Sequence, residues 1–387
     1  MLIGSKELIR DMNSKLILQL IISNQQISRA TLATKTGLTK ATVSSIVANL
    51  IRRDLILESE STSTTLGRKP IMLTFNATCG YTISIDLNIT TITVLVTDLL
   101  GQEQAIFHYS HCVNQSTILA DLTHYIRTAL MQLPTSRYGL IGIGIGIHGI
   151  VCDNHISFSP YAPYAALPFQ STLSATFSVP VYLENESNLS VIGEHAFCHP
   201  ISNILDLNID TGIGAGIILH HTLYSGMNGG AGEFGHTIVE PDGRPCPCGN
   251  NGCLEQYASE QALLTQFAQH LQVARVTIPE FVSAVQQQDP TALQLVTDFT
   301  HYIALALNNL INIFAPEMIV LNSSLFQHFP TLLTNINALV HSKANCTCNI
   351  QVSTLSNSSI LLGASCVCIR QFLQVDDLIF TKPPLEQ

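Results

Sequence analysis

The chain has 387 residues, 46% of them hydrophobic and 11% charged, and its formal net charge is −10. This composition excludes a disordered chain and favours a compact protein of two or three domains. No apolar run reaches the ~18 residues of a membrane-spanning helix, and the charged amino-terminal residues give no sign of a signal peptide. Eleven cysteines without a secretion signal favour reduced thiols, so we expect a cytoplasmic protein with no membrane partner.

The charge is divided unevenly along the chain. Ten of the 17 Lys and Arg residues, but only five of the 27 Asp and Glu residues, lie within residues 1–75. The first 75 residues therefore carry +5 and the remainder carries −15. A basic amino-terminal segment joined to an acidic body is typical of a nucleic-acid-binding module attached to a second functional unit.

Residues 1–78 have the pattern of a winged helix-turn-helix domain. Apolar residues recur at helical spacing within residues 16–21, and Ser28 and Thr39 are suitable N-caps for a second and a third helix. Gly37, between these two helices, can adopt the left-handed conformation of the turn. The sequence therefore predicts three helices with a tight turn between the second and the third.

A wing is predicted after the third helix, because two β-forming runs, 55–57 and 71–75, enclose a polar loop. The exposed face of the third helix and the wing would present polar and basic side chains to DNA. The residues that we expect to contact DNA are Thr39, Lys40, Thr42, Ser44, Ser45, Arg68 and Lys69. A small helical interaction domain with a solvated basic face is the alternative, and the charge, the turn glycine and the wing together favour DNA binding.

Two segments of the body, residues 85–95 and 209–219, resemble each other, and each predicts a β-hairpin whose turn follows an aspartate. The duplication predicts two related α/β lobes with a ligand-binding cleft between them. Glycines in such turns let backbone N–H groups approach nucleotide phosphates. The second copy keeps Gly212, Gly214 and Gly216, whereas the first copy has Asn88, Thr90 and Thr91. A nucleotide site kept in one copy indicates lost phosphotransfer, although simple turn glycines would explain the second copy equally well.

Polar residues follow two further predicted strands. Residues 142–147 alternate glycine and isoleucine and predict a central strand whose backbone lies close to a ligand or to a neighbouring strand. His148 follows this strand, and we expect it to be a core or cleft residue rather than a catalyst. A second strand, 181–183, delivers Asn185 and Glu186 to the mouth of an α/β cleft.

A cysteine-rich loop has the spacing His-x9-Cys-x-Cys-x4-Cys. Three thiols and one imidazole form the ligand set of a closed structural zinc site, and here they are those of His236, Cys246, Cys248 and Cys253. Incidental cysteines in a Gly/Asn/Pro-rich loop are the alternative. Carboxylates and amides around this loop suit vicinal sugar hydroxyls. The candidate sugar-binding residues are Asn185, Glu186, Glu233, His236 and Glu255.

Other features of the second half have plainer explanations. The pairs Cys346/Cys348 and Cys366/Cys368 repeat the Cys-x-Cys spacing, and on a strand each pair would share one face. A second metal site is one alternative, but small buried hydrophobic residues are favoured. An apolar helix around residues 301–310 is expected in the core, and such helices could also build a homodimer that reads a palindromic operator.

Along essentially its whole length the chain resembles the ROK family of repressors and sugar kinases. The most specific motifs are residues 232–236 and the metal loop, residues 246–255. The winged head resembles that of the repressor branch, and residues 10–13, 37–45 and 255–260 resemble the xylose repressors of Gram-positive bacteria.

The resemblance implies a fold of mixed α+β and α/β class, in which a winged helix-turn-helix precedes a two-lobed actin-like body of the ROK/hexokinase type. It also implies zinc bound by His236, Cys246, Cys248 and Cys253. A sugar would be bound by Asn185, Glu233, His236 and Glu255, so that His236 would serve both sites.

Three features depart from the pattern of the family's kinases. Glu186 stands where the kinases have the aspartate that takes the proton from the sugar hydroxyl, and a displacement of about 1 Å can cost ~100-fold in rate. Tyr161 replaces a sugar-contacting asparagine, and Ser323 and Ser324 replace a glycine pair of the adenine pocket. We therefore expect no kinase activity.

We expect residues 1–78 to bind DNA, residues 79–205 to form the smaller lobe together with a C-terminal helix near 360–380, and residues 206–387 to form the larger lobe with the zinc loop and a dimer interface. The predicted function is that of a sugar-responsive repressor of carbohydrate-utilisation genes, those for xylose above all. Its partners would be operator DNA and an aldose, xylose or glucose, and it would assemble as a homodimer or a dimer of dimers. The alternatives are an ATP-dependent sugar kinase with a DNA-binding head and a repressor controlled by a protein partner.

Overall fold

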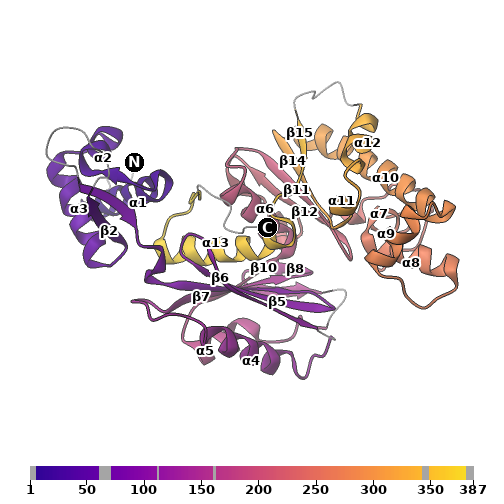
Figure 1. Cartoon of the computed structure of the whole chain (residues 1–387), viewed down its shortest axis with the longest axis horizontal. Coiled ribbons are helices and arrows are strands. Elements are labelled where there is room, and N and C mark those ends of the chain that lie inside the picture. Colours follow the sequence, from indigo (N-terminus) through magenta and orange to yellow (C-terminus); the bar gives the residue numbers. More distant parts are fainter. Residues whose placement is uncertain (1–5, 61–70, 111–112, 160–162, 342–347, 381–387) are drawn as a thin grey trace.

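The computed structural model describes residues 6–60, 71–110, 113–159, 163–341 and 348–380. A small amino-terminal head lies at one end of the molecule, and two larger units follow it (Figure 1). The head packs three helices against an antiparallel sheet of order β1-β3-β2. Its elements are α1 (Lys6–Asn24), β1 (Ile27–Ser28), α2 (Arg29–Thr36), α3 (Lys40–Arg52), β2 (Ile56–Glu60) and β3 (Ile71–Phe75).

The capping signals predicted for the head are present. The hydroxyl of Ser28 accepts a hydrogen bond from the backbone N–H of Thr31, and that of Thr39 accepts one from Thr42, each at 3.1 Å. Gly37 ends α2 with a φ of 68°, which favours glycine. These local interactions hold α2 and α3 in a helix-turn-helix arrangement.

The first lobe is built on a five-stranded sheet of order β10-β7-β4-β5-β6, in which β10, β7 and β4 are parallel. Helices α4 and α5 lie on one face, and the C-terminal helix α13 lies on the other (Figure 1). The bounds are β4 (Tyr81–Leu87), β5 (Thr91–Asp98), β6 (Glu103–Ser110), α4 (Ile118–Leu130), β7 (Leu140–Ile147), α5 (Phe169–Phe177), β10 (Val181–Asn185) and α13 (Ser359–Leu373). A β-ribbon of β8 (Ile150–Cys152) and β9 (His155–Phe158) extends from β7.

The glycines of β7 make room for α13, not for a ligand or a neighbouring strand as the sequence suggested. A Cβ atom at Gly144 would lie 2.7 Å from the carbonyl oxygen of Ala364, and one at Gly142 would lie 3.3 Å from Sγ of Cys368. Cys366 and Cys368 are therefore helical, not strand, residues, and they are 0% and 1% exposed. Both cysteines act as small core residues between α13 and its neighbours.

The second lobe is built on a sheet of order β13-β12-β11-β14-β15. Helix α6 packs against β11 and β12, while helices α7 to α12 gather at the far end of the molecule (Figure 1). The bounds are α6 (Glu186–Phe197), β11 (Ile204–Ile209), β12 (Ile213–Leu219), β13 (Thr222–Leu223), β14 (Met318–Asn322) and β15 (Asn349–Val352). The other helices are α7 (Glu255–Ala258), α8 (Glu260–Leu271), α9 (Ile278–Gln286), α10 (Pro290–Phe314), α11 (Leu325–His328) and α12 (Leu332–Leu339).

Helices α6 and α13 pack against each other between the two sheets and form the junction of the lobes. Polar contacts tie this junction together: Asn322 Nδ2 donates to Ser359 Oγ at 2.7 Å, and the hydroxyls of Ser190 and Ser359 lie 2.8 Å apart. In the described part of the chain no helix is long and apolar enough to cross a membrane.

Candidate functional site

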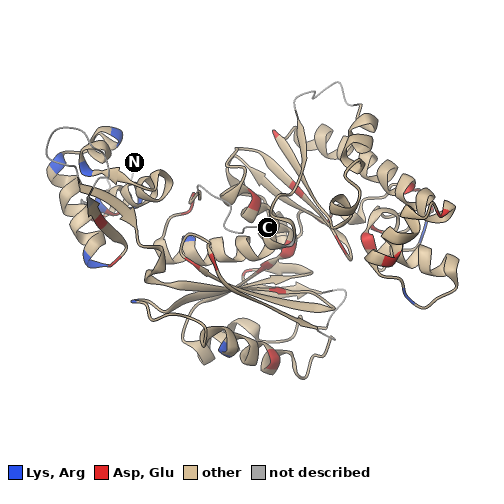
Figure 2. Cartoon of the chain, in the orientation of Figure 1, with Lys and Arg blue, Asp and Glu red and all other residues tan. Residues whose placement is uncertain are grey.

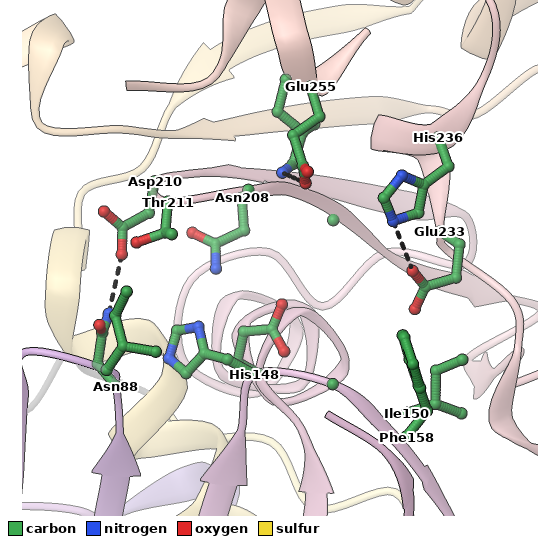
Figure 3. Close-up of a pocket in the computed structure, with 16 residues that line it drawn as sticks. Asn88, His148, Ile150, Phe158, Asn208, Asp210, Thr211, Glu233, His236 and Glu255 are labelled. Carbon is green, nitrogen blue, oxygen red and sulfur yellow. Dashed lines mark hydrogen bonds and ion pairs between the residues drawn. The ribbon is translucent and has the colours of Figure 1, made fainter. Parts of the chain in front are cut away.

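A cavity opens between the two lobes, where the β4–β5 and β11–β12 turns face each other (Figure 3). Its lining combines carboxylates, amides and imidazoles with a small apolar surface. The residues that line it are Asn88, Ile89, His148, Gly149, Ile150, Phe158, Glu186, Asn208, Asp210, Thr211, Gly212, Ile213, Gly214, Glu233, His236 and Glu255. Four of the five candidate sugar-binding residues are in this set, and Asn185 is not.

Asn185 is occupied by structural hydrogen bonds beneath the cavity. Its side-chain oxygen accepts bonds from the backbone N–H groups of Ser187 and Asn188 and so caps α6. Its Nδ2 donates to the carbonyl oxygen of Gly149 at 3.0 Å and to Oε2 of Glu186 at 2.7 Å. In this arrangement Asn185 positions Glu186 and does not face the cavity itself.

Glu186 lines the cavity at the start of α6. Its Oε1 accepts a hydrogen bond from the hydroxyl of Ser187 at 3.1 Å, in addition to the bond from Asn185. Burial in the cleft raises the pKa of Glu186 to about 7, which the nearby His148 partly offsets. Both carboxylate oxygens are therefore hydrogen-bonded, and close to neutral pH this group is in part protonated.

Glu233, His236 and Glu255 approach the cavity from the second lobe (Figure 3). Nε2 of His236 lies 3.7 Å from Oε2 of Glu233. Glu255, at the start of α7, accepts a hydrogen bond from the backbone N–H of Ile213 at 3.3 Å. Two carboxylates that flank an imidazole can accept hydrogen bonds from neighbouring hydroxyl groups.

The cysteine-rich loop brings one ligand atom of each predicted metal ligand into a single cluster. These atoms, from His236, Cys246, Cys248 and Cys253, all lie within 4.8 Å of one another. Nδ1 of His236 lies 3.5 Å from Sγ of Cys246, and the Sγ atoms of Cys248 and Cys253 are 3.6 Å apart. One imidazole nitrogen and three sulfur atoms are a donor set that fits zinc. No second such group of three or more His, Cys, Asp or Glu residues occurs in the ranges that the structure describes.

The fold of this loop depends on close backbone approaches. Gly252 has a φ of 80°, and a Cβ atom there would lie 1.7 Å from the carbonyl oxygen of Glu240, so that only glycine fits. Isolated bridges join Ile238 to Cys253 and Pro245 to Asn251. His236 thus directs Nδ1 to the cysteine cluster and Nε2 to the cavity side, where Glu233 lies.

Residues that the sequence did not assign to the site also line the cavity. Nδ2 of Asn88 donates to Oδ2 of Asp210 at 2.9 Å and joins the turn of the first lobe to that of the second (Figure 3). His148 lies beside them and bonds through Nε2 to Oδ1 of Asp86 at 2.9 Å. Its place directly after β7, at the carboxyl end of a central strand, agrees with the expected core or cleft position, although no ligand was assigned to it from the sequence.

A second cavity lies behind these residues, on the side of the Thr90 and Thr91 turn. Its lining includes the carboxylates of Asp86, Asp210 and Glu260 and, among the described residues, neither Lys nor Arg. Glu260 accepts hydrogen bonds from the hydroxyl of Ser323 at 2.6 Å and from the N–H of Ser324 at 2.7 Å. Three carboxylates, with neither Lys nor Arg in the described lining to offset them, make this lining acidic, which opposes the binding of polyphosphate.

The predicted DNA-contacting residues of the head lie at the start and on the exposed face of α3. Lys40, Ser44 and Ser45 are exposed, while the hydroxyls of Thr39 and Thr42 pair at 2.9 Å in the cap. Arg68 and Lys69 lie outside the described residues. Basic residues gather on the head, and acidic residues are scattered over the two lobes (Figure 2).

Comparison with known proteins identifies both parts. Residues 82–371 match the ROK family model, and residues 10–56 match a model of the winged helix-turn-helix DNA-binding domain. A xylose repressor of Bacillus spizizenii is 35% identical over 385 residues, which cover 96% of this chain and 99% of that protein. The transcriptional dual regulator NagC of Escherichia coli K12 is 28% identical, with 88% of this chain and 87% of NagC covered.

Solved structures agree with this assignment. The crystal structure of a ROK family transcriptional regulator, described as a homologue of E. coli MLC, superposes with a TM-score of 0.80 and 25% identity, covering 96% of this chain and 98% of that chain. A ROK family glucokinase from Streptomyces griseus superposes with a TM-score of 0.66 and 24% identity, covering 74% and 99%, and shows the shared fold of the body. The chain therefore belongs to the ROK family, with an actin-like body of the sugar-kinase type and a winged helix-turn-helix head.

Proposed function

We propose that this protein is a sugar-responsive transcriptional repressor of carbohydrate-utilisation genes, and that its effector is an aldose, with xylose as the first candidate. The observation that carries this proposal is the presence, in one chain, of a DNA-binding head and an interlobe cavity lined by carboxylates. Full-length relatives named xylose repressor support the choice of sugar.

The cavity suits a neutral polyhydroxylated ligand. Glu186, Glu233 and Glu255 can accept hydrogen bonds from hydroxyls, while Ile150 and Phe158 offer an apolar surface to the C–H face of a sugar ring. His236 would contribute to both the sugar and the metal site. Asn185 completes the proposed set by holding the Glu186 carboxylate in place.

We assign the metal as zinc, held by His236, Cys246, Cys248 and Cys253. A closed set of four protein ligands makes this a structural ion that stabilises the loop. The chain's own contribution is to present Glu233 and His236 just before the loop and Glu255 just after it. Loss of the loop fold would therefore disturb the sugar-binding side chains rather than any chemical step.

Operator DNA would be bound by the head, with Thr39, Lys40, Thr42, Ser44 and Ser45 on α3 and with Arg68 and Lys69 at the wing. We take residues 1–78 as this domain, 79–205 with the helix near 360–380 as the smaller lobe, and 206–387 as the larger lobe. Two heads brought together by a homodimer, or by a dimer of dimers, would read a palindromic operator in the cytoplasm.

Contacts between the head and the C-terminal helix α13 could transmit a movement of the lobes to the head. One hydrophobic cluster runs from α1 and α3 of the head to α13. Two side chains reinforce this attachment: the hydroxyl of Tyr138 donates to the carbonyl oxygen of Arg53 at 2.6 Å, and Nε2 of Gln19 donates to that of Asp377 at 2.8 Å. Since α13 also packs on α6 at the lobe junction, a change in lobe geometry would reach the head, with a coupling of about 1–3 kcal/mol.

A sugar kinase with a DNA-binding head is the second candidate, and the site disfavours it. The carboxylate of Glu186, at the position of the kinase base, already accepts hydrogen bonds from Asn185 and Ser187. The second cavity is acidic, as described above, and holds Glu260 where Ser323 and Ser324 face it. We therefore propose a protein without enzymatic activity. Control by a protein partner was suggested by Tyr161, which lies outside the described residues.

The test is a gel-shift assay with full-length protein and DNA selected by that protein from a random pool. We expect xylose to change DNA affinity by roughly fivefold to 150-fold, and the variant Glu255→Gln to bind the same DNA without responding to sugar. If no pentose or hexose changes DNA affinity, the effector assignment is wrong. If the wild type forms sugar phosphate from ATP and Glu186→Ala does not, the protein is a sugar kinase and the proposal of a protein without enzymatic activity is wrong.

A further inference from the structure

His148 occupies the wall between the two cavities. It follows β7 directly, and its ring lines both the sugar cavity and the acidic cavity behind it. On the neighbouring strand β4, Asp86 lines only the second cavity, whereas Glu186 lines only the first. The imidazole thus stands between a carboxylate at its back and a carboxylate on the sugar side.

The pair of His148 and Asp86 is partly buried and closely bonded. Their side chains are 15% and 17% exposed, and Nε2 of His148 lies 2.9 Å from Oδ1 of Asp86. Burial alone would lower the pKa of His148, but the charge and hydrogen bond of Asp86 outweigh it, and with Glu186 and Asp210 they raise this pKa to about 9. The ring is therefore protonated at neutral pH, and both of its nitrogens carry a hydrogen.

One of these two N–H groups is available to a ligand. Nε2–H is used by Asp86, while Nδ1 has no hydrogen-bond partner among the residues that the structure describes. The sugar cavity is otherwise rich in acceptors: Glu186, Glu233 and Glu255 all line it. Over the described lining there is no Lys or Arg, and His236, which directs Nδ1 to the cysteine cluster, offers only Nε2 to the cavity, beside Glu233. A ligand with several hydroxyls needs donors as well as acceptors, and His148 is the cationic donor placed to supply one.

We propose that His148 is a sugar-recognition residue, which donates a hydrogen bond from Nδ1 to one hydroxyl of the bound sugar, and that Asp86 is its positioning residue. This inference rests on the proposed function, because it names a specificity determinant of the same site. Glu186, on the sugar side of the ring, would accept a hydrogen bond from the same hydroxyl or its neighbour. That hydroxyl would thus be matched by one donor and one acceptor.

Isothermal titration of the full-length protein with D-xylose and its monodeoxy analogues tests the proposal. A hydrogen bond to a charged group predicts that His148→Ala weakens xylose binding roughly 10- to 100-fold. One deoxy analogue should bind the wild type more weakly than xylose does, because it lacks the hydroxyl that His148 contacts. The same analogue and xylose should bind His148→Ala equally well, because that variant has no imidazole to contact the hydroxyl. His155→Ala, an exposed histidine on β9, is the matched control and should bind like the wild type.

The role of Asp86 has its own readout. In Asp86→Asn the amide still accepts a hydrogen bond but no longer favours the charged ring, so xylose affinity should fall as the pH rises from 6 to 8. In the wild type the ring stays charged over that range, and Glu186, whose pKa is about 7, becomes a better acceptor as it loses its proton, so the affinity should not fall. His148→Gln keeps a donor and should recover part of the affinity that His148→Ala loses.

The outcomes separate the two proposals. Suppose that the wild type binds xylose and that each deoxy analogue binds more weakly than xylose by the same factor in the wild type and in His148→Ala. His148 then does not recognise the sugar, while the proposed function stands. If the wild type binds no sugar, the proposed effector itself is wrong. Circular dichroism on each variant establishes that it is folded, and Asp86→Asn provides an independent test should His148→Ala not fold.

Discussion

Nδ2 of Asn88 donates a hydrogen bond to Oδ2 of Asp210, at 2.9 Å, and links the two lobes directly across the cleft. The two residues occupy the turns of the duplicated hairpins, one after β4 and the other after β11. In a nucleotide-binding member of this architecture, phosphates would lie between such turns. Here a side-chain bond spans part of that space and joins the two lobes directly.

Exchanging the partners of this bond should test its role. Asn88→Asp places two carboxylates opposite each other, which should open the cleft and weaken sugar binding roughly tenfold, because the closed arrangement becomes less populated. The double variant Asn88→Asp with Asp210→Asn restores one amide and one carboxylate and should recover the wild-type affinity. Titration calorimetry with xylose measures both.

The single variant Asp210→Asn is the control for this exchange, since its side-chain oxygen can still accept from Asn88. Small-angle X-ray scattering should show a larger radius of gyration for Asn88→Asp than for the double variant. Equal affinity and equal size in these two proteins would mean that the bond has no part in closure.

Removing a ligand of the metal site should reduce metal content, stability and sugar affinity. Cys253→Ser should remove bound zinc, which we expect at one ion per chain by mass spectrometry, and should lower the free energy of unfolding by more than about 3 kcal/mol. Sugar binding should weaken too, because Glu255 follows Cys253 by two residues. Cys152→Ser, in the ribbon strand β8, is the control and should keep both the metal and the stability. A metal-free Cys253→Ser protein with unchanged sugar affinity would separate the loop from the sugar site.

The head predicts two different effects on DNA. Lys40→Ala should weaken binding to all sequences and should reduce the slope of log affinity against log salt by about 1, as expected for a phosphate contact. Ser44→Ala should cost about 1 kcal/mol on the preferred sequence and little on random DNA, as expected for a base contact. Fluorescence anisotropy with both DNAs at several salt concentrations distinguishes them.

Arg127→Ala on α4 is the matched control, since its side chain is exposed and α4 lies on the face of the first-lobe sheet opposite α13 (Figure 1). It should leave the salt slope unchanged. A slope that changes equally in Arg127→Ala and Lys40→Ala would show that net charge, not a contact from α3, is being measured.

Features with a local cause were predictable from the sequence. The caps at Ser28 and Thr39 depend on residues three positions away, and the cysteine cluster depends on one short loop. The pair of Asp86 and His148 was not predicted, because it joins adjacent strands of a parallel sheet whose register a single sequence does not reveal.

The glycines of β7 also depend on a contact between segments that are distant in the sequence. Their small size was noted, but the partner that needs the space is α13, more than 200 residues further along the chain. Asn185 illustrates a different limit of sequence-based prediction. An asparagine before a helix is equally suited to cap the helix or to bind a ligand, and here its side-chain oxygen caps α6. The residue type indicated a polar role, and only the packed structure shows which partners it takes.

A buried carboxylate pair at the lobe junction should make stability depend on pH. Glu194 on α6 and Asp206 on β11 are both 0% exposed, and Oε2 of Glu194 has no hydrogen-bond partner within the described residues. Burial raises the pKa of Glu194 to about 7, although a bond from Ser353 opposes it. Burial and then the charge of Glu194 raise the pKa of Asp206 as well. Nε2 of His199 lies 3.8 Å from Oε2 of Glu194.

Because the folded pKa of Glu194 lies above its ordinary value of 4.5, the folded state binds a proton more tightly than the unfolded state. Below pH 4.5 the carboxyl is neutral in both states, and its contribution to stability is fully present. The free energy of unfolding then falls as the pH rises from about 4.5 to 7, by an amount on the order of 3 kcal/mol. Glu194→Gln keeps the shape without the charge, so its melting temperature should exceed that of the wild type at pH 8 by more than at pH 5. Glu103→Gln, at an exposed position on β6, should follow the wild type at both pH values. Parallel pH profiles for Glu194→Gln and wild type would show that this carboxylate stays charged, with a partner that the folded protein supplies.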